Sequence, residues 1–140
     1  MNIYIIGSLR NPRVPEVANE LRKHGFAVFD DWYGTGPNAD EHWQEYEQAR
    51  GRSYIEALYG DAADNIYEFD KEHLDCADAA VLVAPAGKSG HLELGYMIGK
   101  GRLGYILLEA EPERWDVMYN FATLVVRSVK ELLTQDEMQP

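Results

Sequence analysis

The sequence predicts an α/β fold in which helices cover both faces of a parallel β-sheet. Short runs of β-branched and aromatic residues alternate with segments of helical period, the pattern of a chain that crosses back over its own sheet. At roughly 100–200 residues per domain, 140 residues make one domain. Hydrophobic residues are 46% and charged residues 26% of the chain, which is enough for a normal core.

Five segments are predicted to be strands, with a helix after the first of them. The strands are Asn2–Gly7, Ala27–Phe29, Ala79–Ala84, Gly104–Leu108 and Leu124–Val126. Val14, Val17 and Leu21 recur at helical spacing between the first two strands and predict a crossover helix. Pro15 suits its first turn, and Gly25 suits its end.

The rest of the chain is predicted to be mainly helical. Two helices, separated near Tyr59–Asp61, are expected between Asn38 and Ala77. Two more are expected over Glu93–Lys100 and Ser128–Glu137, with a shorter one around Glu113–Phe121. With no repeat or linker, residues 1–134 form the expected single domain, and residues 135–140 are expected to be a flexible tail.

Charge and composition exclude several classes of protein. The chain has 13 Lys and Arg against 24 Asp and Glu, a net charge of −11, and such a surface repels nucleic acid. The single Cys76 cannot form an intramolecular disulfide and fits a reducing cytoplasm. No membrane span or signal peptide is expected, and the four histidines lack metal-ligand spacing, so neither a metal nor another cofactor is predicted.

The ligand site of such a sheet is expected beyond the carboxyl ends of its strands. Three segments should meet there: Ser8–Arg13, Asp30–Asn38 and Pro85–Glu93. The Ser8-to-Asn11 stretch offers hydroxyl, guanidinium and amide groups to a phosphate or a base. Trp32 and neighbouring aromatic residues could stack on a base or form a hydrophobic lid. Neither a dinucleotide fingerprint nor a Walker loop is present.

Glu93 is the first candidate for chemistry. It follows a strand and a glycine-containing loop, and a helix is expected to begin near it. In a first helical turn, the macrodipole and free N–H groups favour an ionised carboxylate. An ionised carboxylate can attack a sugar carbon and form a covalent intermediate. The alternative is a helix-terminal glutamate with no function.

Asp70 is the second candidate. It shares a helical stripe with Leu74 and Ala77, which predicts partial burial of its charge. It precedes the central strand by about nine residues. At roughly 1.5 Å per residue, a helix of this length places Asp70 about 12 Å back toward the carboxyl edge of the sheet, near Glu93. Two carboxylates in different surroundings could act as nucleophile and as acid and base. The alternative is an aspartate that caps a loop or pairs with an arginine.

At this point the sequence resembles the nucleoside 2-deoxyribosyltransferase-like family, which includes 2'-deoxynucleoside 5'-monophosphate N-glycosidases. The resemblance extends from Ile3 to about Val126. It lies in Ile3-Tyr4-Ile5-Ile6-Gly7-Ser8-Leu9-Arg10, in Asp70 with the residues up to Asp78, and in Gly90-x-x-Glu93-Leu94-Gly95. It implies a flavodoxin-like (Rossmann-like) three-layer sandwich with a five-stranded parallel sheet in the order 2-1-3-4-5.

The resemblance also implies roles for individual residues. Glu93 would be the nucleophile, Asp70 would assist departure of the base and activate water, and Tyr4 would hold the Glu93 carboxylate. The expected substrate-binding residues are Gly7, Ser8, Arg10, Trp32, Gly87, Lys88, Ser89 and Gly90. Such proteins are homodimers or larger oligomers, and Met118 and Asn120 lie in the segment expected to close a neighbouring subunit's pocket.

One departure bears on the substrate. Transferases of the family that act on free nucleosides carry an aspartate at the position of Gly87. Gly87, Lys88 and Ser89 instead offer backbone donors and a cation, which favours a 5'-monophosphate and hydrolysis.

Three functions follow as hypotheses. The first is cleavage of the N-glycosidic bond of a (deoxy)nucleoside or its 5'-monophosphate through a glycosyl-Glu93 ester, with transfer of the sugar to water or to another base. The second is a TIR-like glycohydrolase of NAD or a signal nucleotide, whose larger ligand the aromatic insert from Trp32 to Tyr59 could enclose. The third is a nucleotide sensor that performs no reaction.

Overall fold

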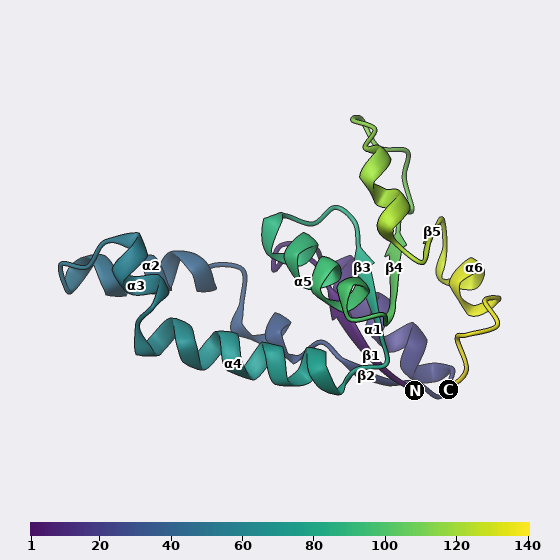
Figure 1. The fold of residues 1–140 in the computed structure, drawn as a ribbon, viewed down its shortest axis with the longest axis horizontal. Helices are drawn as coiled ribbons and strands as arrows, with labels where there is room; N and C mark the ends of the chain where they lie inside the picture. The colour runs from purple at the N-terminus through teal and green to yellow at the C-terminus, as the bar shows by residue number, and fades with distance from the viewer.

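The computed structural model describes residues 1–140 and contains one five-stranded parallel sheet (Figure 1). Its strands are β1 (Asn2–Ile6), β2 (Ala27–Phe29), β3 (Ala79–Val83), β4 (Leu103–Leu107) and β5 (Leu124–Val126). Their order is β2-β1-β3-β4-β5, and every neighbouring pair is parallel. The predicted fold class and strand order are confirmed.

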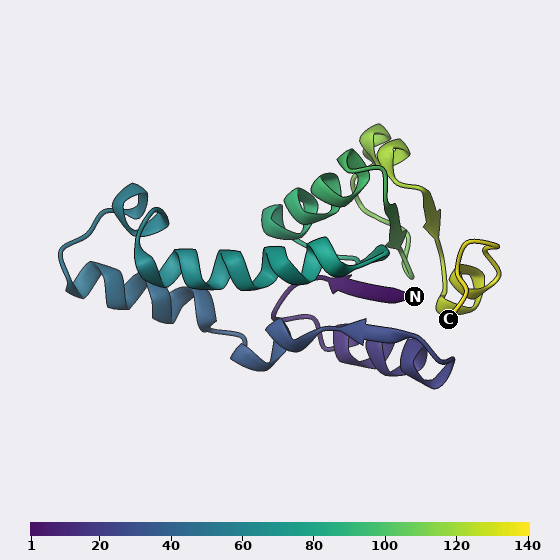
Figure 2. The same ribbon diagram turned by 60° about the horizontal axis from the view of Figure 1, so that its bottom comes forward.

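The chain forms α-helices and 3₁₀ helices, some of which cover the two faces of this sheet. They are α1 (Arg13–Lys23), α2 (Ala39–Ala49), α3 (Tyr54–Leu58), α4 (Asp61–Cys76), α5 (Lys88–Gly99) and α6 (Val129–Leu133), with 3₁₀ helices η1 (Asp31–Thr35) and η2 (Val117–Phe121). Figure 2 shows α1 on one side of the sheet and α4 and α5 on the other. None of these helices has the length and apolar character needed to cross a membrane.

Alternation along β1 builds the two cores. Ile3 and Ile5 face α1 and α6, whereas Tyr4 and Ile6 face α4 and α5, because successive side chains of a strand point to opposite faces. Val14, Val17, Ala18 and Leu21 of α1 are fully buried, as their spacing predicted. Tyr4 is therefore fixed on the face of the sheet that also carries α4 and α5.

Several boundaries differ from the sequence prediction. The helix expected over Glu93–Lys100 begins five residues earlier, at Lys88, because Gly87 is its N-cap. The helix expected over Ser128–Glu137 ends at Leu133. Three helices, not two, lie between Asn38 and Ala77, because a capping box between Ser53 and Glu56 starts the short α3.

The insert between β2 and β3 forms an arm. Figures 1 and 2 both show α2, α3 and the first half of α4 extending away from the sheet. Arg102 holds the other end of α4: its Nη1 donates to the carbonyls of Asp75 at 2.5 Å and Ala77 at 2.6 Å. The carbonyls at this helix end are satisfied by a side chain from the start of β4.

One residue of the C-terminal segment, Met138, packs on the core. Met138 is 2% exposed and belongs to the same core as Ile3 and Leu21. A turn in which the Met138 N–H donates to the carbonyl of Gln135 returns the chain to the protein. Burial of this apolar side chain offsets part of the entropy of ordering the turn, so Met138 anchors a segment that was expected to be flexible.

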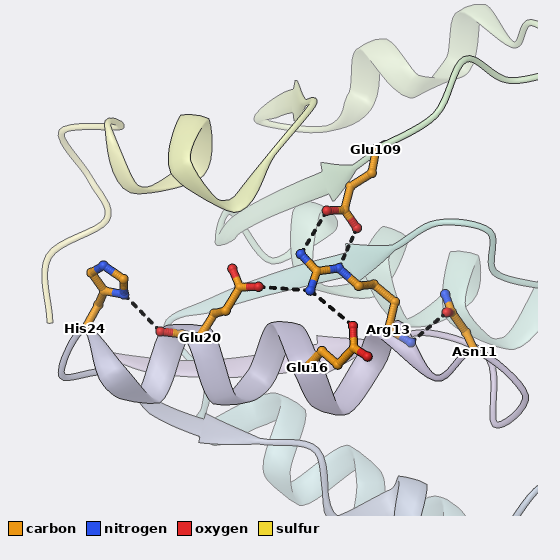
Figure 3. Close-up of polar contacts among 6 residues, drawn as sticks. All are labelled: Asn11, Arg13, Glu16, Glu20, His24 and Glu109. Atoms are coloured by element: carbon orange, nitrogen blue, oxygen red, sulfur yellow. Dashed lines mark hydrogen bonds and ion pairs between the residues drawn. The ribbon is translucent and has the colours of Figure 1, made fainter.

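Arg13 connects the start of α1 to the end of β4 (Figure 3). Its guanidinium binds both carboxylate oxygens of Glu109, at 2.8 and 2.9 Å. Glu16 and Glu20 of α1 accept from the same guanidinium. Hydrogen bonding to Glu109, the largest influence, raises the pKa of Arg13. These contacts fix the loop between β1 and α1 beside the carboxyl edge of the sheet.

Gly104 in β4 should be intolerant of a side chain. A Cβ there would lie 2.7 Å from Cγ1 of Ile98 and 3.0 Å from Cδ1 of Leu94, both on α5. We expect Gly104→Ala to lower the free energy of unfolding by about 1–3 kcal/mol through overpacking, measured by urea denaturation. The matched control is Gly99→Ala, where a Cβ meets nothing within 4 Å. Equal stability of the two variants would contradict this account of how α5 packs.

Candidate active site

Glu93, Asp70 and Tyr4 come together between the sheet and the helices α4 and α5. Tyr4 is 1% exposed in β1, Asp70 is half-buried in α4, and Glu93 is half-buried in α5. The charges of both carboxylates raise the pKa of the Tyr4 hydroxyl, after the larger effect of burial. The structure therefore brings together the three residues that were predicted to be catalytic.

The surroundings of Glu93 differ from the prediction. It lies in the second turn of α5, beyond the first-turn N–H groups that were expected to favour its charge. Burial is the main cause that raises its pKa to about 7, and the charge of Asp70 adds to the effect. Burial therefore acts against the ionised form that the helix terminus was expected to favour.

Tyr4 opposes this rise. Hydrogen bonding from its hydroxyl lowers the pKa of the Glu93 carboxyl. Since the pKa of Tyr4 itself is raised by burial, the hydroxyl keeps its proton and remains a donor. Tyr4 thus favours the ionised form of Glu93.

Asp70 also titrates above its ordinary range. Burial is the largest cause that raises the pKa of Asp70, and the charge of His73 acts in the opposite direction. Burial disfavours the charge of both carboxyl groups, and the charge of Asp70 raises the pKa of Glu93. The site can therefore hold one ionised carboxylate and one protonated acid together, which general acid catalysis with a nucleophile requires.

A polar cleft opens at the carboxyl ends of β1 and β3. It has a volume of about 480 Å³, and Ser8, Arg10, Asn11, Pro12, Pro85, Ala86 and Gly87 line it. The Ser8 hydroxyl accepts from the Arg10 N–H at 3.1 Å, and Asn11 Oδ1 accepts from the Arg13 N–H at 3.0 Å. Asn11 also lines the cleft, and its buried Nδ2 has no hydrogen-bond partner within the protein.

Not every predicted binding residue has a free side chain here. Arg10 forms an ion pair with Glu41 of α2, and Lys88 and Ser89 are exposed at the start of α5. Gly7 and Gly90 allow close packing: a Cβ would lie 2.6 Å from Val14 Cγ2 at Gly7 and 2.9 Å from Ile6 Cγ2 at Gly90. Their role in the structure is to let α1 and α5 approach the sheet.

The Trp32 side chain packs against the protein interior and does not line the polar cleft. Its Nε1 donates to the carbonyl of Ile5 at 2.8 Å, and its ring packs against both cores. Tyr33 contacts Trp32 edge-on, whereas Trp43 and Tyr54 form a separate pair on the arm. The predicted aromatic group is therefore divided between two parts of the molecule.

Met118 and Asn120 lie in the 3₁₀ helix η2. Met118 is 60% exposed, and Asn120 Nδ2 donates to the carbonyl of Val117 in the same 3₁₀ helix. Met118 lines an apolar pocket of about 540 Å³ between α5 and η2, together with Leu94, Ile98, Ile106 and Phe121. His91 of this pocket bonds the Tyr119 hydroxyl at 2.9 Å. No residue of the carboxylate pair lines it, so this larger pocket is separate from the candidate active site.

One residue near the site was missed by sequence reasoning. His73 lies three residues after Asp70 on α4. The spacing of three residues, which puts two side chains on one helix face, was the available signal for His73. No group of three or more His, Cys, Asp or Glu residues is arranged to hold a metal ion.

Replacing Glu93 should stabilise the protein at alkaline pH. Because its pKa rises from 4.5 to about 7 on folding, the native state binds more protons than the unfolded state between these values. Wild-type stability therefore falls as pH rises through this window. We expect Glu93→Gln to be about 1–3 kcal/mol more stable than wild type at pH 8 and equally stable at pH 4, measured by urea denaturation. The exposed Glu45→Gln serves as the control, and a gain that is the same at both pH values would contradict the burial of Glu93.

Comparison with known proteins places this fold among solved structures. A 2-deoxyribosyltransferase from Bacillus psychrosaccharolyticus matches with a TM-score of 0.64 and 16% identity, over 97% of this chain and 93% of the other. A CMP N-glycosidase from Clostridium botulinum matches with a TM-score of 0.57 and 14% identity, over 99% and 100%. A conserved protein from Enterococcus faecalis matches with a TM-score of 0.60 and 15% identity, over 95% and 94%. No family model and no curated protein matches the sequence. The chain thus shares its whole fold with these structures.

Proposed function

We propose that this protein cleaves the N-glycosidic bond of a nucleoside or nucleoside 5'-monophosphate through a covalent glycosyl-Glu93 ester. The observation that carries the proposal is the pairing of Glu93 with Asp70 in a partly buried site that Tyr4 faces. Such a pair supplies a nucleophile and an acid at one place, which is what displacement at a sugar carbon needs.

The reaction has two steps that use these three residues. In the first step a Glu93 oxygen bonds to the anomeric carbon, the carbon–nitrogen bond breaks, and its electron pair goes to the base. Asp70 gives its proton to the departing base nitrogen and becomes a carboxylate. In the second step Asp70 takes a proton from water, whose oxygen attacks the anomeric carbon and releases Glu93. Tyr4 holds the Glu93 carboxylate in its ionised form.

The comparisons support this assignment through the fold. A 2-deoxyribosyltransferase and a CMP N-glycosidase share the fold over nearly the whole chain. Together with the resemblance around Tyr4, Asp70 and Glu93, this supports membership of the nucleoside 2-deoxyribosyltransferase-like family. In that family a partner subunit closes the pocket. The exposed Met118 and the neighbouring Asn120, which do not reach Glu93 within one chain, are the residues we assign to that contact in a homodimer or larger oligomer.

The polar cleft supports a 5'-monophosphate as substrate and water as acceptor. Ser8, Arg10 and Asn11 line it, and Lys88 and Ser89 stand at the N-terminus of α5. Donors and cations at a helix start are suited to a phosphate dianion. The absence of a carboxylate at Gly87 removes a group that would repel it.

The TIR-like alternative loses its main support in this structure. It relied on the insert from Trp32 to Tyr59 enclosing a large ligand, and α2 and α3 of that insert extend away from the sheet (Figure 2). The sensor remains the contrasting hypothesis, and it predicts binding of nucleotide without release of base.

Substitution of the two carboxyl groups tests the reaction. We expect Glu93→Gln to lower base release at least about 10³-fold because the nucleophile is lost, and Asp70→Asn to lower it about 10²–10⁴-fold because the acid is lost. Chromatography of free base from deoxynucleosides, their monophosphates, ribonucleotides and NAD gives the rates. Glu72→Gln, exposed on α4, is the control and should retain wild-type activity. A wild-type protein that binds nucleotide and releases no base would instead be the sensor.

Substitution of Arg10 tests the phosphate site separately. We expect Arg10→Gln to raise KM for a 5'-monophosphate about 10–100-fold, since one charge-assisted hydrogen bond is lost, and to leave KM for the free nucleoside within about threefold. Lys130→Gln, exposed on α6, is the matched charge control. Equal effects on both substrates would assign Arg10 to folding of the loop and leave the phosphate without this partner.

A further inference from the structure

Arg10 is the one cation that lines the polar cleft. The other residues that line it are neutral: Ser8, Asn11, Pro12, Pro85, Ala86 and Gly87. Arg13, at the start of α1, is already paired with Glu16, Glu20 and Glu109. The positive charge that the cleft offers to a ligand therefore depends on the Arg10 side chain.

Arg10 is bound to a carboxylate of the arm in this structure. Its Nη2 donates to Oε1 of Glu41, which lies in the first turn of α2. A guanidinium binds an anion in bidentate fashion either through Nε and Nη2 or through Nη1 and Nη2, so Nη2 belongs to both arrangements. Glu41 thus occupies a donor that a phosphate would need for bidentate binding.

The loop that carries Arg10 does not depend on this ion pair. The Arg10 N–H donates to Ser8 Oγ at 3.1 Å, and the Asn11 N–H donates to the Ser8 carbonyl at 3.1 Å. Asn11 Oδ1 accepts from the Arg13 N–H at 3.0 Å. These contacts hold the turn after β1 without the Arg10 side chain, so the guanidinium can change its partner while the loop keeps its shape.

The ion pair is exposed and therefore weak enough to exchange. The side chains of Arg10 and Glu41 are 63% and 48% exposed, and water screens the attraction of such a pair. A phosphate monoester carries a charge of about −1.5 to −2 at pH 7, against the single charge of a carboxylate. A phosphate in the cleft should therefore displace Glu41 from Arg10.

We propose that Glu41 is an internal competitor of the substrate phosphate and so determines how strongly the protein binds a nucleoside 5'-monophosphate. In the free protein Glu41 neutralises Arg10, and when the monophosphate binds, Arg10 exchanges Glu41 for the phosphate. Glu41 thereby weakens binding of the monophosphate and leaves binding of the free nucleoside unchanged. The inference rests on the proposed function, which assigns the phosphate to this cleft.

Isothermal titration calorimetry in the Glu93→Gln background, in which the ligand should not be consumed, tests the exchange. The probes are the deoxynucleoside 5'-monophosphates and the corresponding deoxynucleosides. We expect the added Glu41→Gln to tighten binding of the monophosphate about 2–5-fold, the effect of one exposed ion pair, and to leave the Kd of the deoxynucleoside within about 1.5-fold. Weaker binding of the monophosphate would mean that Glu41 orients Arg10 toward the phosphate, and would overturn the proposal.

Two controls separate the exchange from a general effect of charge. Glu45 is exposed on α2 one turn after Glu41, so Glu45→Gln removes the same charge without touching Arg10. It should leave the Kd of the monophosphate within about 1.5-fold. Glu41→Gln should also have no effect when Arg10→Gln is already present, since no exchange is left. A gain from Glu45→Gln equal to that from Glu41→Gln, or an equal gain without Arg10, would overturn the proposal.

Binding and base release together separate this inference from the proposed function. If Glu41→Gln tightens binding as expected but wild type releases no base from any substrate, the proposed reaction fails and the exchange stands. If wild type releases base but the Kd of the monophosphate does not respond to Glu41→Gln, the exchange fails and the reaction stands. If no monophosphate binds, the phosphate site and the exchange both fail.

Discussion

The pairing of β1 with β3 is the interaction on which the site depends. Ile3 lies opposite Ala79 and Ile6 opposite Leu82, so both strands end at the same edge of the sheet. The loop after β1 and the loop after β3 therefore meet and line one polar cleft, and the alternation of β1 turns Tyr4 toward the helices that carry Asp70 and Glu93. Residues far apart in sequence become neighbours because parallel strands share the direction in which they end.

Burial gives the carboxyl pair its chemical character. An exposed glutamate would be ionised at neutral pH, and so would an exposed aspartate, and a site made of them would hold no proton to give to a base. Desolvation between α4, α5 and the sheet raises the pKa of both groups. Tyr4 lowers the pKa of Glu93, and His73 lowers the pKa of Asp70. The same burial lowers the free energy of unfolding as pH rises. The rest of the structure must therefore supply the stability that the buried carboxyl groups cost.

Close packing holds α5 in the place where this chemistry is possible. Gly90 brings the helix against Ile6, and Gly104 brings β4 under Ile98 and Leu94. Arg102 fixes the C-terminus of α4, and Arg13 connects α1 to the end of β4. These contacts of glycine and arginine thus set how far the Glu93 side chain is buried, and this burial raises its pKa.

The sequence by itself determined the class of fold and the strands, and it pointed to Asp70 and Glu93, with Tyr4 from the family resemblance, as candidate site residues. Strand composition and helical spacing are local signals, so Ala27–Phe29, Leu124–Val126 and the buried face of α1 could be predicted from them. Only the tertiary structure decided the start of α5 at Lys88, the raised pKa of Glu93, the burial of Met138 and the stacking of His73 on Phe29. Each of these depends on contacts between distant segments, and desolvation in particular is a property of the whole neighbourhood and leaves no pattern along the chain.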